Sequence, residues 1–388
     1  MTRPDTTTLE ILERLIAFPT VSRDPNAPLM DYVAGLLRGA GIEPILVPNA
    51  DGSKANLFAS VGGAEGGVML SGHTDVVPVD GQDWTRPPFA LTEGGGRLYG
   101  RGTADMKGFV ASALAAMLRA AGTRLASPLH LALSYDEELG CLGAHSLIAL
   151  LRQGPARPAM CIVGEPTGLN VATGHKGKTG LRAICKGVEA HSALAPTGLN
   201  ALHLAADLMA VIRAHQSRLA EEGLRDGDYD VPYSTLHVGK LNGGVALNIV
   251  PNLAVMEFEL RNLAGDDPET LLAPIRRSAD GLRDIARTRF PEADVTIEVF
   301  NAYPGLDTPD SASVVRFVKS LTGANGTIKV AFGTEGGLFS TELGVPTVVC
   351  GPGSMAQGHK ADEYLETEQL ARCDAMLDAL LERLRAGL

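Results

Sequence analysis

The sequence predicts an α/β protein in which a mixed, mostly parallel sheet carries helices on both faces and a smaller α+β domain is inserted. In the first half of the chain, short apolar runs alternate with helical patterns, and the end of the chain resumes this alternation. Such alternation is typical of a layered α/β domain with a mostly parallel sheet. Between these parts the order becomes strand, helix, two strands, helix and strand, which matches a ferredoxin-like sandwich.

The length of the chain allows this organisation. Its 388 residues are enough for two domains and a large core. We predict one discontinuous domain at residues 1–179 and 296–388, interrupted by an inserted domain at residues 180–295. The sequence contains no internal repeat that would favour a different organisation.

The elements of the discontinuous domain follow from short apolar runs for strands and spaced apolar positions for helices. Near the N-terminus, Thr7 and Glu10 suggest a capping box at the start of a helix. The other expected helices are residues 30–39, 106–121, 142–152, 336–343 and 367–385. The expected strands are residues 56–61, 67–71, 129–135, 160–163, 327–332 and 347–350.

The inserted domain is expected to contain four strands and two helices. The strands are predicted at residues 180–187, 234–241, 253–261 and 295–300, and the helices at residues 199–215 and 267–288. The first helix carries an apolar stripe whose spacing lets one face pack against the sheet. The stripe consists of Leu202, Ala205, Leu208, Met209 and Ile212.

Composition argues against two classes of partner. The formal net charge is −11 and no basic run offsets it, so neither nucleic acid nor an anionic membrane surface is expected to bind. No stretch reaches the roughly 18 apolar residues that a membrane span needs. The five cysteines occur singly and the N-terminus lacks a signal-peptide pattern, which together favour reduced thiols and a cytoplasmic location.

Five side chains of the metal-binding type fall at the ends of separate predicted strands. They are His73, Asp105, Glu138, Glu165 and His359. In an open α/β sheet, ligands gather at the carboxyl ends of the strands. Two imidazoles and three carboxylates suit two divalent ions, with zinc the first choice and cobalt or manganese acceptable to the same ligands. The set indicates metal-assisted hydrolysis.

Three carboxylates have more than one interpretation. Asp105 stands just before a predicted helix, where it can bridge two cations or cap the helix. Asp75 forms an H-x-D pair with His73, in which it can hold the other ring nitrogen of His73 or be an ordinary turn residue. Glu137 adjoins Glu138, and such a pair is often only a solvated acidic turn. With four other ligands available, we expect Glu138 to bind metal and Glu137 to move protons.

Four residues are candidates for contact with the substrate. His191 could donate a hydrogen bond to a developing oxyanion, or be an ordinary loop histidine. Arg261, together with Asn248, flanks the second hairpin of the inserted domain, and it suits bidentate binding of a carboxylate or a salt bridge on the strand surface. Glu335 could bind a cationic substrate side chain, or interact with the dipole of the helix that it opens.

The motifs SGHTDVVPVD, GRGTADMKG, DEELG and VGEPT resemble those of the dinuclear zinc amidohydrolases. This family includes acetylornithine deacetylases, succinyl-diaminopimelate desuccinylases, aminoacylases and glutamate-releasing carboxypeptidases, and the resemblance covers nearly the whole chain. The segments AHSALAPTGLNA, GTEGG and GPGSMAQGHKADEYLE are most similar to the acetylornithine deacetylase branch. GTEGG differs from the GTEAP form of some deacetylases.

The resemblance implies two zinc ions per subunit that share Asp105. The implied ligand sets are His73, Asp105 and Glu165 for one ion, and Asp105, Glu138 and His359 for the other. It further implies that Glu137 is the general base and then the general acid, that Asp75 orients His73, and that the peptide bond after Asp105 is cis.

The resemblance also implies a lid and dimerisation role for the inserted domain. His191 would reach across a homodimer interface into the site of the partner, and Asn248 and Arg261 would bind the substrate carboxylate. The implied reaction is removal of the acetyl group from N2-acetyl-L-ornithine, giving L-ornithine and acetate in arginine biosynthesis. Another N-acyl amino acid deacylase, such as a desuccinylase or aminoacylase, and a dipeptidase are alternatives. A metal-binding protein without catalytic turnover is a more remote alternative, because such a protein would not need Glu137 as a base.

Overall fold

The computed structural model describes residues 3–388, which form two compact units. The outer unit contains the chain up to His175 together with Leu306–Leu388, and the inserted unit is Lys176–Gly305. The predicted boundaries at residues 180 and 295 fall inside strands β9 (Gly177–Lys186) and β12 (Asp294–Tyr303). Both strands extend further than their apolar patterns indicate, so the inserted unit is longer at each end.

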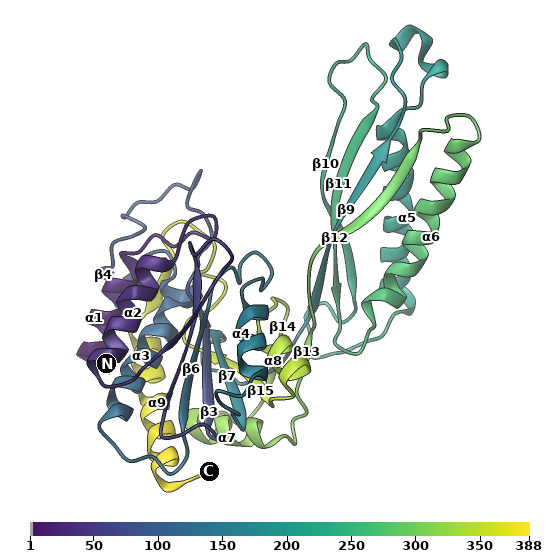
Figure 1. The fold of residues 1–388 in the computed structure, drawn as a ribbon. Coiled ribbons are helices and arrows are strands. Elements are labelled where there is room, and N and C mark those ends of the chain that lie inside the picture. The colour runs from purple at the N-terminus through teal and green to yellow at the C-terminus, as the bar shows by residue number, and fades with distance from the viewer. Residues whose placement is uncertain (1–2) are drawn as a thin grey trace. The chain divides into compact units, whose positions relative to one another are not determined.

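The outer unit is built on a nine-stranded sheet (Figure 1). The sheet follows the order β1-β2-β6-β3-β7-β15-β8-β13, with β14 beside β8. The strands are β1 (Ile45–Pro48), β2 (Ala55–Val61), β3 (Val68–His73), β6 (Leu129–Ser134), β7 (Met160–Pro166), β8 (Ala172–His175), β13 (Leu306–Asp307), β14 (Ile328–Val330) and β15 (Thr347–Gly351). The central strands β6, β3, β7 and β15 are parallel, whereas β1 pairs antiparallel with β2, β2 with β6, and β8 with β15 and β13. The predicted mixed, mostly parallel sheet is confirmed.

Helices cover both faces of this sheet (Figure 1). On one face α1, α2 and α9 pack around α3, and on the other α4 packs against α8. The helices are α1 (Thr6–Ile16), α2 (Ala27–Gly39), α3 (Gly108–Ala121), α4 (Ala144–Arg152), α7 (Ser313–Thr322), α8 (Gly336–Leu343) and α9 (Thr367–Ala386). Nearly every side chain of α3 is buried, which makes this helix the centre of the core. A small sheet of β4 (Thr92–Gly94), β5 (Arg97–Tyr99) and β16 (Tyr364–Glu366) adds to this unit.

The N-terminal helix is capped differently from the prediction. Asp5, not Thr7, is the N-cap, and its carboxylate accepts the backbone N–H of Thr7 at 2.7 Å. The backbone N–H of Asp5 in turn donates to Asp374 of α9, whose carboxylate also accepts the hydroxyls of Thr8 and Ser112. Asp374 therefore joins α1, α3 and α9 through one buried carboxylate, a contact that local sequence does not show.

The inserted unit has the ferredoxin-like order that the sequence predicts. Its antiparallel sheet runs β10-β11-β9-β12, and both helices pack on one face of it (Figure 1). The remaining elements are β10 (Thr235–Gly243), β11 (Leu253–Asn262), α5 (Ala201–Glu222), α6 (Pro268–Arg287) and a short 3₁₀ helix, Ser192–Thr197. Leu204, Ala205, Leu208 and Ile212 of α5 are buried in a separate core, while Leu202 and Met209 are only partly buried.

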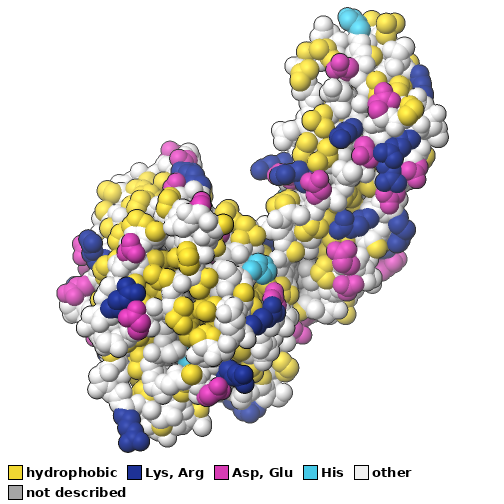
Figure 2. All heavy atoms as spheres, viewed as in Figure 1, with side chains coloured by type: hydrophobic (Ala, Val, Ile, Leu, Met, Phe, Trp, Pro, Cys, Tyr) yellow, Lys and Arg dark blue, Asp and Glu magenta, His cyan; other side chains and the backbone are white. Residues whose placement is uncertain are grey.

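The surface of the inserted unit mixes charges of both signs. On the face shown in Figure 2, lysine and arginine side chains alternate with aspartate and glutamate. Several of these charges form ion pairs, such as Arg182 with Glu257 and Arg283 with Asp280. Within residues 3–388, no helix is long and apolar enough to cross a membrane.

Candidate metal centre

Three of the predicted site residues stand at the ends of adjacent strands. His73 is the last residue of β3, Glu165 lies near the end of β7, and Glu138 follows β6. Strand β3 pairs in parallel with both β6 and β7, so their carboxyl ends meet at one edge of the sheet. The fold therefore brings these three side chains together.

The two other predicted ligands come from loops and not from strand ends. Asp105 lies in an irregular turn, Thr103–Lys107, directly before α3. The peptide bond between Asp105 and Met106 is cis, as the resemblance implied. His359 lies between β15 and β16 in a backbone conformation with φ of 60°.

Asp105 presents its two carboxylate oxygens to two different groups of side chains. Oδ1 lies 2.9 Å from Nε2 of His73, and that nitrogen lies 3.5 Å from Oε1 of Glu165. Oδ2 lies 3.1 Å from Nε2 of His359, which lies 3.2 Å from Oε2 of Glu138. The five side chains thus form two groups of three donors that share one carboxylate.

The two groups differ in their exposure to solvent. The side chains of His73 and Glu165 are 1% and 4% exposed, whereas that of His359 is 47% exposed. Glu138 is partly exposed. Solvent and substrate can therefore approach from the side of His359, while the group around His73 is enclosed.

The electrostatics of the cluster favour positive charge at both imidazoles. Burial opposes charge on His73, yet the carboxylates of Glu165, Asp105 and Asp75 raise its pKa well above the ordinary value. Hydrogen bonds with Asp105 and Glu138 raise the pKa of His359 to about 10. Burial raises the pKa of three carboxyls, Glu137, Glu138 (to about 6) and Glu165.

This arrangement fits two divalent cations. Burying so many carboxylates costs free energy unless cations compensate their charge. A metal ion bound at each of the two imidazole nitrogens would supply this positive charge, as a proton at the same nitrogen would. A mixed set of imidazole and carboxylate donors suits zinc, cobalt or manganese. Asp105 would bridge the two ions, since each of its oxygens faces a different group.

The carboxylate of Asp75 holds the turn that carries Glu137 and Glu138. Its Oδ1 accepts the backbone N–H of Glu137 at 3.1 Å, and its Oδ2 accepts that of Glu138 at 3.3 Å. Ser22 donates its hydroxyl to Oδ2 at 2.7 Å. Nδ1 of His73 lies 2.9 Å from the backbone carbonyl of Asp75 but 3.6 Å from its carboxylate. The expected bond from His73 to the Asp75 carboxylate is therefore corrected to a bond to its carbonyl.

Glu137 lies among the same donors without being needed as a ligand. One ligand atom from each of His73, Glu137 and Glu165 lies within 4.8 Å of the others, as is also true of His73, Asp105 and Glu138. The thiol of the buried Cys141 donates to Oε1 of Glu137 at 3.5 Å. Glu137 thus offers a carboxylate that borders the cluster and can exchange a proton there.

The inserted unit holds two of the substrate-binding candidates side by side. His191 caps the 3₁₀ helix, and its Nδ1 accepts the backbone N–H of Ala193 at 3.1 Å. The backbone N–H of Ser192 donates to the carbonyl of Asn248 at 2.9 Å. His191 and Asn248 are exposed at one end of the sheet.

Arg261 lies toward the other end of the same sheet. Its guanidinium donates to Glu259 at 3.1 Å and to the hydroxyl of Tyr303 at 3.0 Å. Asn248 lies before the start of β11 and Arg261 near its end, and the eight residue steps from Leu253 to Arg261 span roughly 26 Å in an extended strand. The expectation that Asn248 and Arg261 bind one carboxylate together is therefore not met within a single chain.

Glu335 lies beneath the surface. It is 2% exposed, and the hydroxyl of Ser71 donates to its Oε2 at 3.3 Å. Burial raises its pKa. The protein covers its carboxylate in this structure, and binding of a cationic substrate side chain by Glu335 stays a prediction.

Sequence reasoning did not single out Ser22 or assign a role to Cys141. Ser22 reaches Asp75 across 53 positions of the chain, so no local motif could point to it. Cys141 stands four residues after Glu137, a spacing that is visible in the sequence but does not by itself distinguish a contact from a buried thiol.

Comparisons with known proteins identify the family. Residues 69–383 match the model of "Peptidase family M20/M25/M40". The chain is 36% identical over 375 residues to an acetylornithine deacetylase of Myxococcus xanthus, and the match covers 94% of each protein.

Solved structures share the fold at lower identity. An M20 family metallo-carboxypeptidase from Sulfolobus solfataricus superposes with a TM-score of 0.80 at 18% identity, covering 99% of this chain and 100% of that one. A tripeptidase from Staphylococcus aureus has a TM-score of 0.76 at 19% identity, with both chains fully covered. A dinuclear metal-binding M20 peptidase from Bacillus subtilis has a TM-score of 0.64 at 15% identity over 97% of this chain and 98% of its own. From the family match and the deacetylase relative, this chain belongs to peptidase family M20/M25/M40 and is a metallohydrolase.

Proposed function

We propose that this protein removes the acetyl group from N2-acetyl-L-ornithine, releasing L-ornithine and acetate. The arrangement around Asp105, in which each oxygen faces an imidazole and a second carboxylate, supports hydrolysis at a two-metal centre. The relative named acetylornithine deacetylase supports the choice of substrate. A role in arginine biosynthesis in the cytoplasm is part of this proposal, and five free, buried cysteines agree with it.

The ligands proposed for the two cations, zinc first, are the two groups that share Asp105. When bound, such cations would lower the pKa of the attacking water molecule and polarise the acyl carbonyl. Glu137 takes the proton of the attacking water as the C–O bond forms, and it later delivers this proton to the leaving amine as the C–N bond breaks. Asp75 keeps Glu137 and Glu138 in place through their backbone N–H groups.

The residues of the inserted unit complete the site in this proposal. Arg261 binds the α-carboxylate of the substrate, which fixes its orientation. His191 of the partner subunit donates a hydrogen bond to the developing oxyanion. Asn248 is adjacent to His191 and distant from Arg261 within the chain, so it acts together with His191. The inserted unit thereby serves as lid and dimerisation domain.

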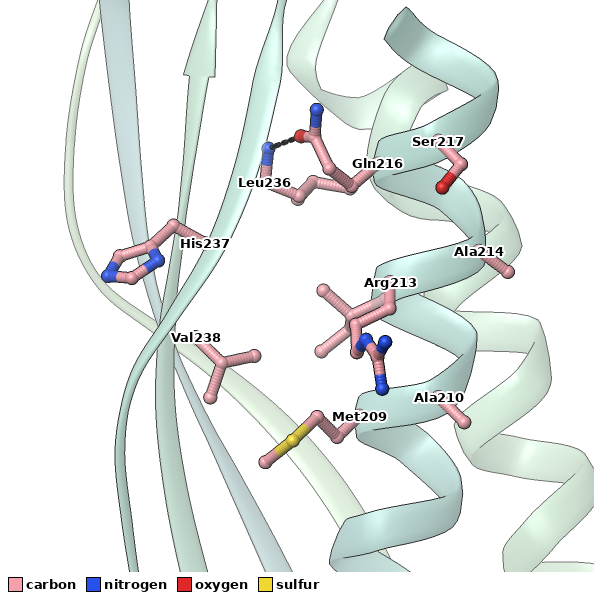
Figure 3. Close-up of a pocket in the computed structure, with 10 residues that line it drawn as sticks. Met209, Ala210, Arg213, Ala214, Gln216, Ser217, Leu236, His237 and Val238 are labelled. Atoms are coloured by element: carbon pink, nitrogen blue, oxygen red, sulfur yellow. Dashed lines mark hydrogen bonds between the residues drawn. The ribbon is translucent and has the colours of Figure 1, made fainter.

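A groove in the inserted unit supports a homodimer. It has a volume of about 630 Å³ and lies between α5 and β10 (Figure 3). Strand β10 is at the edge of its sheet, and an edge strand offers unpaired backbone groups to another chain. Exposed apolar side chains also gather at the loop that precedes β11, including Val245 and Leu247.

Ala210 in this groove provides a test of the dimer. We expect Ala210→Arg to convert a dimer to a monomer in size-exclusion chromatography with light scattering, because the long cation fills the groove. Gly281→Arg is the matched control, since Gly281 on α6 has open space around its Cβ position. A monomeric wild-type protein at micromolar concentration, or an Ala210→Arg variant that stays dimeric, would contradict the proposed interface.

A substrate panel tests the reaction itself. We expect kcat/KM for acetate release from N-acetylornithine to exceed that for N-acetylmethionine, N-acetylcitrulline and N-acetylglutamate by at least about tenfold, which is ~1.4 kcal/mol in transition-state binding. Amine release from succinyl-diaminopimelate and from dipeptides is measured in parallel. A preference for any of these over N-acetylornithine would replace the proposed substrate while leaving the metal-dependent hydrolysis in place.

A further inference from the structure

A buried ion pair beside the metal centre has no part in the proposed reaction. Arg101 and Glu363 are each about 1% exposed, and Nη1 of Arg101 lies 2.6 Å from Oε2 of Glu363. Burying two charges costs desolvation free energy that their attraction only partly repays, so such a pair is weak evidence for stability. Its contacts show a more specific role.

Glu363 holds the backbone of the turn that presents Asp105. Its other oxygen, Oε1, accepts three backbone N–H groups, those of Gly102 at 3.0 Å, Ala104 at 3.0 Å and Asp105 at 3.1 Å. The three donors lie within four residues of the chain and converge on one atom. The turn is therefore fixed at its backbone, and with it the direction in which the bridging carboxylate points.

Arg101 connects the same carboxylate to the loop of His359. Its Nη2 donates to Oε1 of Gln82 at 2.6 Å, and Nε2 of Gln82 donates to the backbone carbonyl of His359 at 2.9 Å. Nη1 also lies 3.3 Å from the carbonyl of Lys360. The chain of hydrogen bonds thus runs from the backbone of Asp105 to that of His359.

We infer that Glu363 and Arg101 are positioning residues that hold the Asp105 turn and the His359 loop at the separation the second cation requires. The inference deepens the proposed function, because it concerns the ion bound by Asp105, Glu138 and His359. Mutation of residues that orient metal ligands typically lowers metal affinity by roughly 10- to 100-fold. His359 depends on such support, since its side chain is half exposed.

Zinc binding to Glu363→Gln provides the test. The amide keeps the size of the side chain but cannot accept both the backbone donors and Arg101. We expect one of two zinc ions per chain to bind roughly 10- to 100-fold more weakly in competition with a chromogenic chelator, and the other to bind as in the wild type. Combining Arg101→Met with Glu363→Gln should weaken zinc binding no further than either substitution does alone, because both break the same connection.

Asp374→Asn is the matched control for general damage. Asp374 is also a buried carboxylate with three hydrogen-bond donors, but these come from Asp5, Thr8 and Ser112, away from the metal ligands. We expect this variant to lower the melting temperature of the metal-free protein without changing zinc affinity. Unchanged zinc affinity in a folded Glu363→Gln variant would overturn the inference.

Gln82→Leu keeps the inference testable if Glu363→Gln does not fold. It removes the bond to the His359 carbonyl and creates no unpaired charge, and we expect a several-fold weaker second zinc ion. Wild-type affinity in Gln82→Leu would overturn the inference as well. Because the readout is zinc affinity, the comparison stands even if the wild type fails to release acetate, which would instead contradict the proposed function.

Discussion

Replacing Glu137 by glutamine is expected to lower kcat for acetate release by about 10³-fold while both zinc ions remain bound. General acid–base groups typically contribute 10²- to 10⁴-fold, and the amide can neither take the proton of the water nor return it to the amine. Glu137 is not needed in either group of donors around Asp105, so metal content should be unchanged. The check is steady-state acetate release together with zinc determination by atomic absorption.

Two further variants make this result specific. Glu137→Ala removes the side chain and should be as inactive as the glutamine variant. Glu137→Asp keeps a carboxylate that is one methylene shorter, and we expect it to retain more activity than either. Hydrolysis at the wild-type rate in Glu137→Gln would remove Glu137 as general base, and loss of one zinc ion would show that it is a ligand.

Much of the metal centre can be predicted because it depends on strand ends. The apolar runs that become β3, β6 and β7 are evident in the sequence, and parallel strands place their carboxyl ends at one edge. This brings His73, Glu138 and Glu165 together without knowledge of side-chain contacts. Asp105 and His359 were expected at strand ends as well, but both lie in loops, whose course is not set by the pairing of strands.

Other contacts could not be predicted because they are not local. The Asp75 carboxylate was expected to hold His73, but it holds the turn of Glu137 and Glu138. Asn248 and Arg261 both flank the second hairpin in the sequence, yet the length of β11 separates them. Glu335 opens a helix as expected, but its burial depends on packing against β3 and not on its own neighbours.

Contacts between buried carboxylates and backbone turns explain why the residues around the metal ligands matter as much for the geometry of the site as the ligands themselves. Asp75 and Glu363 each accept backbone N–H groups from a turn that carries metal-binding side chains. Each backbone donor is a fixed feature of the chain, so the carboxylate selects one conformation of the turn. The sequence alone shows only two acidic residues. In the folded protein, their carboxylates orient the turns that carry metal-binding side chains.

Asp105→Asn is expected to lose one of the two zinc ions and to lower kcat by about 10³-fold or more. An asparagine has one oxygen acceptor, so it can face only one of the two groups that Oδ1 and Oδ2 now serve. Zinc at about 1,000 times its Kd stabilises a folded protein by ~4 kcal/mol per site. The rise in unfolding free energy on adding zinc should therefore be smaller by about this amount in the variant, measured by calorimetry with and without the metal.

His359→Ala should produce the same loss of one ion but leave the group around His73 intact, because His359 contacts only the second group. Two zinc ions in Asp105→Asn, with wild-type stabilisation, would show that the two cations do not share Asp105.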